Sequence, residues 1–175
     1  AKAHPGEIKW GLNVGAGLHF AYAEFVAATG TEFRIVPGGG DADQTTKLLG
    51  RHIDVATPCE MVPKPYYDTG DLKCLGVMSD ERTLLLPNTP TLKEQDIDVI
   101  FMFEPGLYGP ADLPDYVVEK VSQATKKALN DPECIKDLLK VGMYPAFLSA
   151  SEFKDNLQEL DSKLYFLSMR TGLLK

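Results

Sequence analysis

The sequence predicts an α/β fold, in which helices cover a parallel β-sheet, on two observations. Short strand-like segments alternate with helix-like segments along the first third of the chain. Each of the two helix-like segments follows a glycine turn, at residues 11–17 and at residues 38–40. Because parallel strands need a crossover connection, usually a helix, this order favours a parallel sheet with ligands at the carboxyl ends of its strands.

The first strand–helix unit has the pattern of an anion-binding turn. Residues 7–10 are short and partly apolar, as in a strand, and residues 18–28 carry apolar side chains at helical spacing before Gly30. Glycines between them let the backbone approach a ligand, and the first helical N–H groups have no partner of their own. A phosphate or carboxylate could bind there. The glycines fit a tight turn without a ligand equally well, so both interpretations stay open.

The second unit repeats this arrangement. Residues 31–37 alternate apolar and polar side chains, as a second strand would, and lead into the glycine turn at residues 38–40. We expect a helix over residues 41–50 with its leucines facing inward, and a third short strand over residues 53–56.

The rest of the chain predicts mostly helices. Between the two parts we expect a helical segment at 58–67, a strand at 72–78, a helical turn at 91–95 and extended chain at 99–103 and 106–108. In the final third we expect helices over 114–129, from 130 or 131 to Gly142, and from the Ser149–Glu152 capping box to about Thr171.

Composition and charge exclude several classes of partner. Hydrophobic residues make up 44% and charged residues 25% of the chain, as in ordinary globular proteins. The net charge of −7 argues against duplex DNA and anionic membranes as partners. No apolar run reaches the roughly 20 residues that cross a bilayer. Because the chain starts at Ala1 without a methionine, we expect a processed or shortened chain.

Histidines and cysteines give no metal pattern. The three histidines are not spaced as metal ligands: His4, His19 and His52. His19 could donate a hydrogen bond to an anion or be an ordinary polar residue at a helix edge. Cys59 and Cys74 could pair in an oxidising compartment, or they and Cys134 could be three inert thiols. We therefore expect no metal, and no Gly-x-Ser-x-Gly motif suggests a hydrolase.

An oxidoreductase is the alternative function that the motifs allow. Gly11, Gly15 and Gly17 match the glycine spacing of short-chain dehydrogenases, and Tyr116 and Lys120 have their Tyr-x-x-x-Lys spacing. Such an enzyme would bind NAD(P). However, a dinucleotide-binding fold needs more strands than this chain supplies. Two glycine-lined helix starts without an obvious catalytic group favour a binding protein, with no enzyme activity and no cofactor.

From residue 36 onward the sequence resembles one family through many ordered motifs. The segment "VPGGG" followed by "LLGRHIDV" is similar to "VPxxG…LLxGxVDv" of the TctC/Bug family, the periplasmic substrate-binding proteins of tripartite tricarboxylate transporters. The segment "LPNTPTLKEQ" is similar to the family's "lPdvPTlkEqG", and "GLYGP" looks like its "GlfaP". The resemblance covers nearly the whole chain.

This resemblance implies a type II periplasmic-binding-protein fold that closes on a carboxylate. Residues 1–100 would form the second α/β lobe, and residues 101–175 a crossover strand and C-terminal helices that belong to or pack on the first lobe. Family members are much longer, so we expect their signal peptide and most of the first lobe to precede the point that matches Ala1. A chain with such an exposed lobe surface could form a non-native dimer.

The family's two carboxylate loops give the candidate ligand-binding residues. They are Asn13, Gly15, Ala16, Gly17 and His19 in the first loop and Gly38, Gly39, Gly40 and Asp41 in the second. Asp41 could contact an ammonium group of the ligand or cap the following helix, and we favour the cap. The sequence thus predicts a periplasmic solute-binding protein that delivers a di- or tricarboxylate, an acidic amino acid or an aromatic acid to the transporter's membrane subunits.

Overall fold

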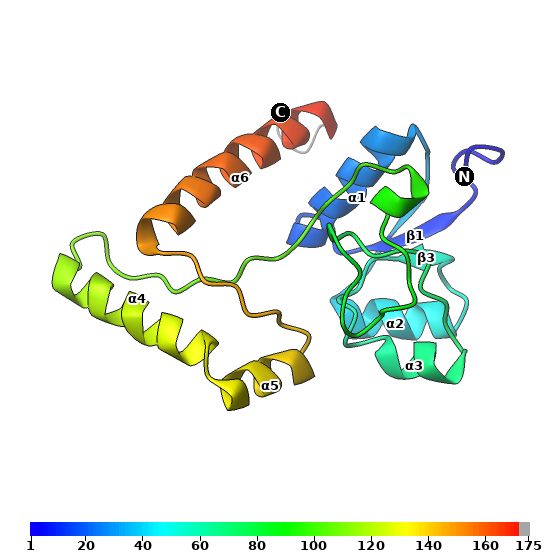
Figure 1. Ribbon diagram of the computed structural model, residues 1–175. Coiled ribbons are helices and arrows are strands. Elements are labelled where there is room, and N and C mark those ends of the chain that lie inside the picture. Colours follow the sequence, from blue (N-terminus) through cyan, green and yellow to red (C-terminus); the bar gives the residue numbers. More distant parts are fainter. Residues whose placement is uncertain (172–175) are drawn as a thin grey trace. The chain divides into compact units, whose positions relative to one another are not determined.

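The computed structural model describes residues 1–171, which form two compact units (Figure 1). Unit 1 comprises Ala1–Met102 and the end of the last helix from Leu167, and unit 2 comprises Phe103–Phe166. Among the described helices, none has the length and apolarity needed to cross a bilayer.

Unit 1 is built on a three-stranded parallel sheet in the order β2-β1-β3. Its strands are β1 (Lys9–Leu12), β2 (Arg34–Pro37) and β3 (Val55–Ala56). Helix α1 (Gly17–Thr29) connects the first two strands, and α2 (Asp41–Leu49) connects the second and third. The predicted strand–helix–strand–helix–strand order and the α/β fold class are therefore confirmed.

The two connecting helices lie on opposite sides of the sheet, as Figure 1 shows. The chain moves from the central strand β1 to β2 on one side, and then passes back to β3 on the other. Since parallel crossovers are right-handed, connections in opposite directions place their helices on opposite faces. Both helices consequently start at the same edge of the sheet, where the strands end.

An aromatic cluster forms the core between the sheet and α1. Trp10 of β1 is 2% exposed, and its ring centroid lies 5.0 Å from that of Tyr22, 5.3 Å from Phe25 and 4.8 Å from Phe33. Edge-to-face and tilted contacts of this kind stabilise aromatic cores beyond the area they bury. They fix α1, and with it the loop that precedes α1, on the sheet.

Glycine at position 11 is required by the packing of the opposite face. A Cβ atom on Gly11 would lie 2.3 Å from Cδ1 of Ile53, which is 2% exposed. No real Cβ approaches a methyl carbon so closely. The first glycine of the motif is thus explained by close packing rather than by ligand contact.

The strand expected at residues 72–78 does not form. Within this segment only Val77 makes a β-bridge, and its partner is Thr91. The other residues of the segment belong to no strand. The Leu75 carbonyl accepts a hydrogen bond from Nε2 of Gln95 at 3.1 Å. The side chains of Leu92 and Gln95 also pack against Gly76, where a Cβ atom would lie within 2.8 Å of each.

Two other segments differ in detail from the expectation. The helical segment expected at 58–67 begins late, as α3 (Lys64–Thr69), after turns at residues 60–63. Residues 99–103 and 106–108, expected to be extended and to contain the crossover strand, carry no strand. Phe101 donates its N–H to the Met78 carbonyl, and the chain makes no continuous ladder there.

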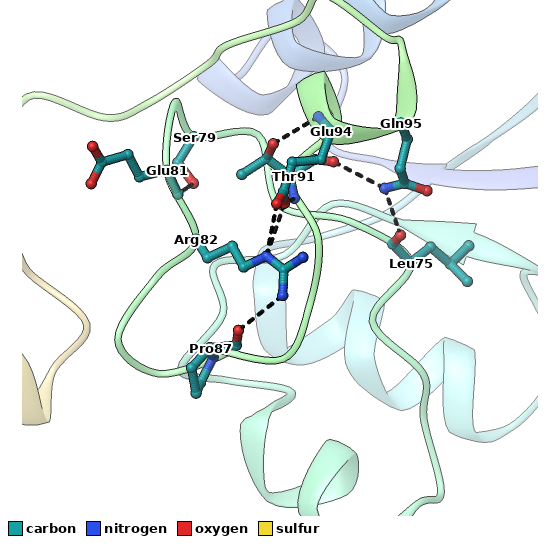
Figure 2. A network of polar contacts seen from close by, with 8 residues as sticks. All are labelled: Leu75, Ser79, Glu81, Arg82, Pro87, Thr91, Glu94 and Gln95. Atoms are coloured by element: carbon teal, nitrogen blue, oxygen red, sulfur yellow. Dashed lines mark hydrogen bonds and ion pairs between the residues drawn. The ribbon is translucent and has the colours of Figure 1, made fainter.

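A polar network holds the short helix η1 (Lys93–Gln95) in place (Figure 2). Thr91 Oγ1 accepts the Glu94 N–H at 3.0 Å, and Glu94 Oε2 accepts the Thr91 N–H at 2.7 Å, which is a reciprocal capping box. Arg82 Nε donates to both carboxylate oxygens of Glu94. The helical turn expected at residues 91–95 is confirmed, and it is tied to the preceding loop.

Unit 2 consists of α4 (Asp115–Leu129), α5 (Pro132–Lys140) and most of α6 (Ala150–Thr171). Asp131 caps α5 by accepting the N–H groups of Glu133 and Cys134. The predicted capping box at the start of α6 is confirmed, because Glu152 accepts the Ser149 N–H at 2.8 Å. Not one residue from Phe103 to Phe166 is buried, so unit 2 has no core of its own.

Candidate functional site

The structure brings the two predicted glycine loops together. Leu12 and Pro37 are partners in the β1–β2 ladder, and the Gly38 N–H donates to the Leu12 carbonyl at 2.9 Å. Residues 13–17 and 38–41 therefore leave adjacent strands at the same edge of the sheet. This is the edge at which open α/β sheets bind ligands.

The first loop is a tight turn that ends in an uncapped helix. Asn13 accepts the Ala16 N–H at 3.1 Å, and Gly15 has a φ of +84°, which favours glycine. Ala16 is the N-cap of α1 and provides no side-chain hydrogen bond. The N–H groups of Gly17 and Leu18 have no acceptor within the helix and are left for another partner.

The second loop uses two of its amides internally. The Gly38 N–H bonds to Leu12, and the Gly39 N–H donates to Oδ2 of Asp43 at 2.7 Å. Gly40 is the N-cap of α2, again without a side-chain hydrogen bond. The N–H groups that α2 leaves for a partner are therefore those of its first turn, which begins at Asp41.

Asp41 does not cap α2, contrary to the prediction. It lies one residue inside the helix, and its carboxylate accepts the Cys59 N–H at 3.2 Å. At this position the side chain points to the segment after β3 rather than back over the helix start. The first turn of α2 is thereby joined to the third strand end.

The acidic residue Asp43 is neutralised locally. Its carboxylate accepts a hydrogen bond from Lys47 Nζ at 2.8 Å as well as from Gly39. Both donors stabilise the charged form and lower the pKa of Asp43. The negative charge beside the second loop is thus shared with a lysine.

His19 lies in the first turn of α1 and is 7% exposed. Its Nδ1 accepts the Gly15 N–H at 3.1 Å, and burial lowers its pKa. An accepting Nδ1 carries no proton, so the imidazole is neutral with its proton on Nε2. The side chain bonds to the loop itself.

Sequence reasoning missed two polar residues at this edge. Gln44 is 1% exposed, and its Nε2 donates to the Gly39 carbonyl at 3.3 Å. Within the described residues, Gln44 Oε1 and Thr57 Oγ1 are buried without a hydrogen-bond partner. Gln44 precedes Leu48 by four residues, and this helical spacing could have placed it on the inner face of α2.

Groups that would support other chemistry are not assembled. Among residues 1–171, no three histidine, cysteine or acidic side chains are grouped as metal ligands. Cys59, Cys74 and Cys134 are free thiols, so the pairing of Cys59 with Cys74 that the sequence left open is not formed. Tyr116 of the dehydrogenase-like motif is 75% exposed and lies in unit 2, whereas the glycine loops lie in unit 1.

Comparison with known proteins identifies the family. Residues 1–167 match the "Tripartite tricarboxylate transporter family receptor" family, TctC. The "UPF0065 protein in gbd 5'region" of Cupriavidus necator is 30% identical over 178 residues, which is 100% of this chain and 54% of that protein. This chain therefore spans about half the length of that relative.

Solved structures agree with this result. A TctC solute-binding protein from Polaromonas superposes with a TM-score of 0.79 at 28% identity, covering 94% of this chain and 58% of that one. An R. palustris protein described with adipate gives a TM-score of 0.77 at 20% identity, covering 98% and 58%. These neighbours confirm the predicted type of periplasmic-binding-protein fold. The chain belongs to the TctC family of tripartite tricarboxylate transporter receptors.

Proposed function

We propose that this chain carries the carboxylate-binding loops of a periplasmic solute-binding protein that delivers a small organic acid to a tripartite transporter. The observation that carries the proposal is the pair of uncapped helix starts at adjacent strand ends. Neither Ala16 nor Gly40 caps its helix with a side chain. The family and the R. palustris protein described with adipate support the ligand class.

The binding step follows from the backbone. Helix starts present free N–H groups and a positive dipole end, so an anion is stabilised there. A carboxylate could accept the N–H groups of Gly17 and Leu18 and those of the first turn of α2. Hydrogen bonds to a charged group contribute on the order of 1.5–3 kcal/mol each.

The other predicted residues take supporting roles in this proposal. The Asn13 side chain could donate to a second ligand oxygen, since Asn13 is half-buried at the loop. Gly39 and Gly40 are exposed and leave room for the ligand, while their loop is held by Leu12 and Asp43.

We also propose that unit 1 is the second lobe of the receptor and that unit 2 packs on a first lobe outside residues 1–175. The lack of any buried residue in Phe103–Phe166 supports this, because its apolar side chains need a partner. The greater length of the relatives supports it too. The proposal includes no catalytic role for any residue.

An NMR titration with a matched pair of variants tests the binding loops. Because residues 1–175 are proposed to carry one lobe of the receptor, we expect weak binding, seen as saturable shifts of the Gly17 and Leu18 amides with succinate, citrate, glutamate, benzoate or adipate. Gly17→Pro removes one N–H that α1 does not use, and proline suits the first helical position. The extended Ala16, with ψ of 170°, also accepts a following proline.

The control Gly17→Ala keeps the N–H and should keep binding. We expect Gly17→Pro to weaken binding about tenfold or more, the loss of one hydrogen bond to a charged group. Loop amides that stay unshifted with every acid would refute the proposal. Shifts with NAD alone would favour the dehydrogenase-like alternative instead.

A further inference from the structure

We propose that His19 is the positioning residue of the first glycine loop, and that protonation of its imidazole releases the loop and weakens carboxylate binding. The binding half of this inference rests on the proposed function. The structural half concerns the loop alone and can be tested without a ligand.

His19 holds the turn of the first glycine loop by a hydrogen bond. Gly15 is the residue at which the loop turns, with a φ of +84°, and its N–H donates to Nδ1 of His19 at 3.1 Å. The acceptor lies in the first turn of α1, close to the free N–H groups of Gly17 and Leu18. One hydrogen bond therefore connects the turn of the loop to the helix start that would hold the anion.

Only the neutral imidazole of His19 can accept the Gly15 N–H. In the charged form both ring nitrogens carry protons, so Nδ1 would face the Gly15 N–H as a second donor. His19 is 7% exposed and lies at the positive end of α1, and both features disfavour a cation. When His19 does take up a proton, the Gly15 bond must break.

The titratable groups next to the first loop are neutral or already paired, so they do not stabilise the protonated form of His19. Tyr22, whose ring centroid lies 6.2 Å away, stays neutral because burial and the Glu32 charge raise its pKa. At the second glycine loop, on the adjacent strand end, Asp41 bonds to the Cys59 N–H and Asp43 bonds to Lys47 and Gly39. Burial alone lowers the pKa of His19.

The first test follows the loop without ligand by NMR. In the chain at about pH 7.5 we expect the His19 proton on Nε2, and between about pH 7 and pH 4 we expect the Gly15 amide shift to change together with the ring nitrogens. The ring nitrogens of the exposed His4 and His52 are followed in the same spectra, so that the His19 signals can be told apart from theirs. A proton on Nδ1 at neutral pH, or a Gly15 amide that ignores the titration, would overturn the inference.

The second test compares wild type with His19→Asn. The Oδ1 of asparagine can occupy the place of Nδ1, accepts the same N–H and does not titrate. We expect His19→Asn to bind succinate as the wild type does near pH 7.5, and His19→Ala to bind about three- to tenfold more weakly, the loss of one hydrogen bond.

Comparing the variants at one pH cancels the titration of succinate itself. At a pH below the Gly15 and His19 transition found in the first test, we expect the wild type to bind about three- to tenfold more weakly than His19→Asn. Equal or tighter binding by the wild type at that pH would mean that the imidazolium assists the anion, and would overturn the inference. If succinate does not bind, the comparison uses the acid that shifts the Gly17 and Leu18 amides. If no acid shifts them, the proposed function loses its support, while the Gly15 titration still decides the role of His19.

Discussion

The carboxylate of Asp41 accepts the backbone N–H of Cys59 at 3.2 Å, and this bond joins the start of α2 to the segment after β3. The contact connects residues 18 positions apart. It also places a negative charge beside a thiol, and the reactivity of that thiol can report on the contact.

Cys59 should react faster when this charge is removed. Partial burial of the thiol and the Asp41 carboxylate raise its pKa to about 11, from an ordinary value of 9.0. Asp41→Asn keeps an oxygen that accepts the Cys59 N–H but loses the charge, so the pKa of the thiol should fall. We expect alkylation by iodoacetamide near pH 8 to become about three- to tenfold faster.

The matched control is Asp43→Asn in the same turn, which should leave the rate at Cys59 unchanged. Cys134 in unit 2 serves as the internal reference for reagent concentration. Identical Cys59 rates in Asp41→Asn and wild type would show that Asp41 does not influence the thiol.

Loss of the Thr91 hydroxyl should destabilise unit 1. Thr91 is 1% exposed, and its Oγ1 accepts the Glu94 N–H at 3.0 Å (Figure 2). Thr91→Val keeps the shape and removes this cap, so we expect a loss of about 1–2 kcal/mol in the free energy of unfolding in urea. Thr91→Ser keeps the hydroxyl and removes only the methyl group, so it should lose less stability than Thr91→Val. A valine variant as stable as the wild type would contradict the prediction.

Stability should decline in acid because of carboxylates that are paired in the folded chain. Bonds to Arg82 and to the Thr91 N–H lower the pKa of Glu94 below its ordinary 4.5, and bonds to Lys47 and Gly39 lower that of Asp43 below 3.8. The contribution of these two carboxylates to the free energy of unfolding is fully present above their ordinary pKa values, which hold in the unfolded chain. It is lost as the pH falls through their lower pKa values in the folded chain.

The measurement is the urea midpoint as a function of pH from neutrality downward. Glu94→Gln should make the acid decline shallower, since one of the groups that takes up a proton on unfolding has been removed. The Glu119→Gln variant, in an exposed part of α4, is the control and should follow the wild-type curve. A wild-type midpoint that rises on acidification would contradict the prediction.

Local sequence patterns predicted the part of the fold that depends on neighbouring residues. The strand–helix alternation, the glycine turns and the Ser149–Glu152 capping box are visible within a few residues of sequence. The strand expected at 72–78 failed because a strand needs a partner over several residues: here only Val77 is paired, with Thr91, and the Leu75 carbonyl accepts a side-chain N–H from Gln95.

In the candidate site, too, the sequence predicted the local features but not the contacts with distant partners. The sequence placed glycines before two helices, and the structure sets these loops at adjacent strand ends. It could not show that the Gly38 and Gly39 N–H groups are bonded to Leu12 and Asp43, because a glycine pattern does not contain the partner of its amide. Nor could it show that His19 bonds to the loop, since both a ligand contact and an internal contact need a polar residue there.

The helices of unit 2 should be far less protected than those of unit 1 in this chain alone. No residue in Phe103–Phe166 is buried, and isolated helices of about 12–15 residues are marginal in water. We therefore expect the amides of α4, 15 residues long, to exchange their hydrogens much faster than those of α1, whose Ala21 is 0% exposed. Hydrogen exchange by mass spectrometry, with light scattering of the same sample, measures both protection and mass. Slow exchange of α4 in a monomer would contradict the proposal that unit 2 needs a first lobe outside residues 1–175. Slow exchange that appears only together with a dimer mass would assign the covering partner to a second copy of the chain.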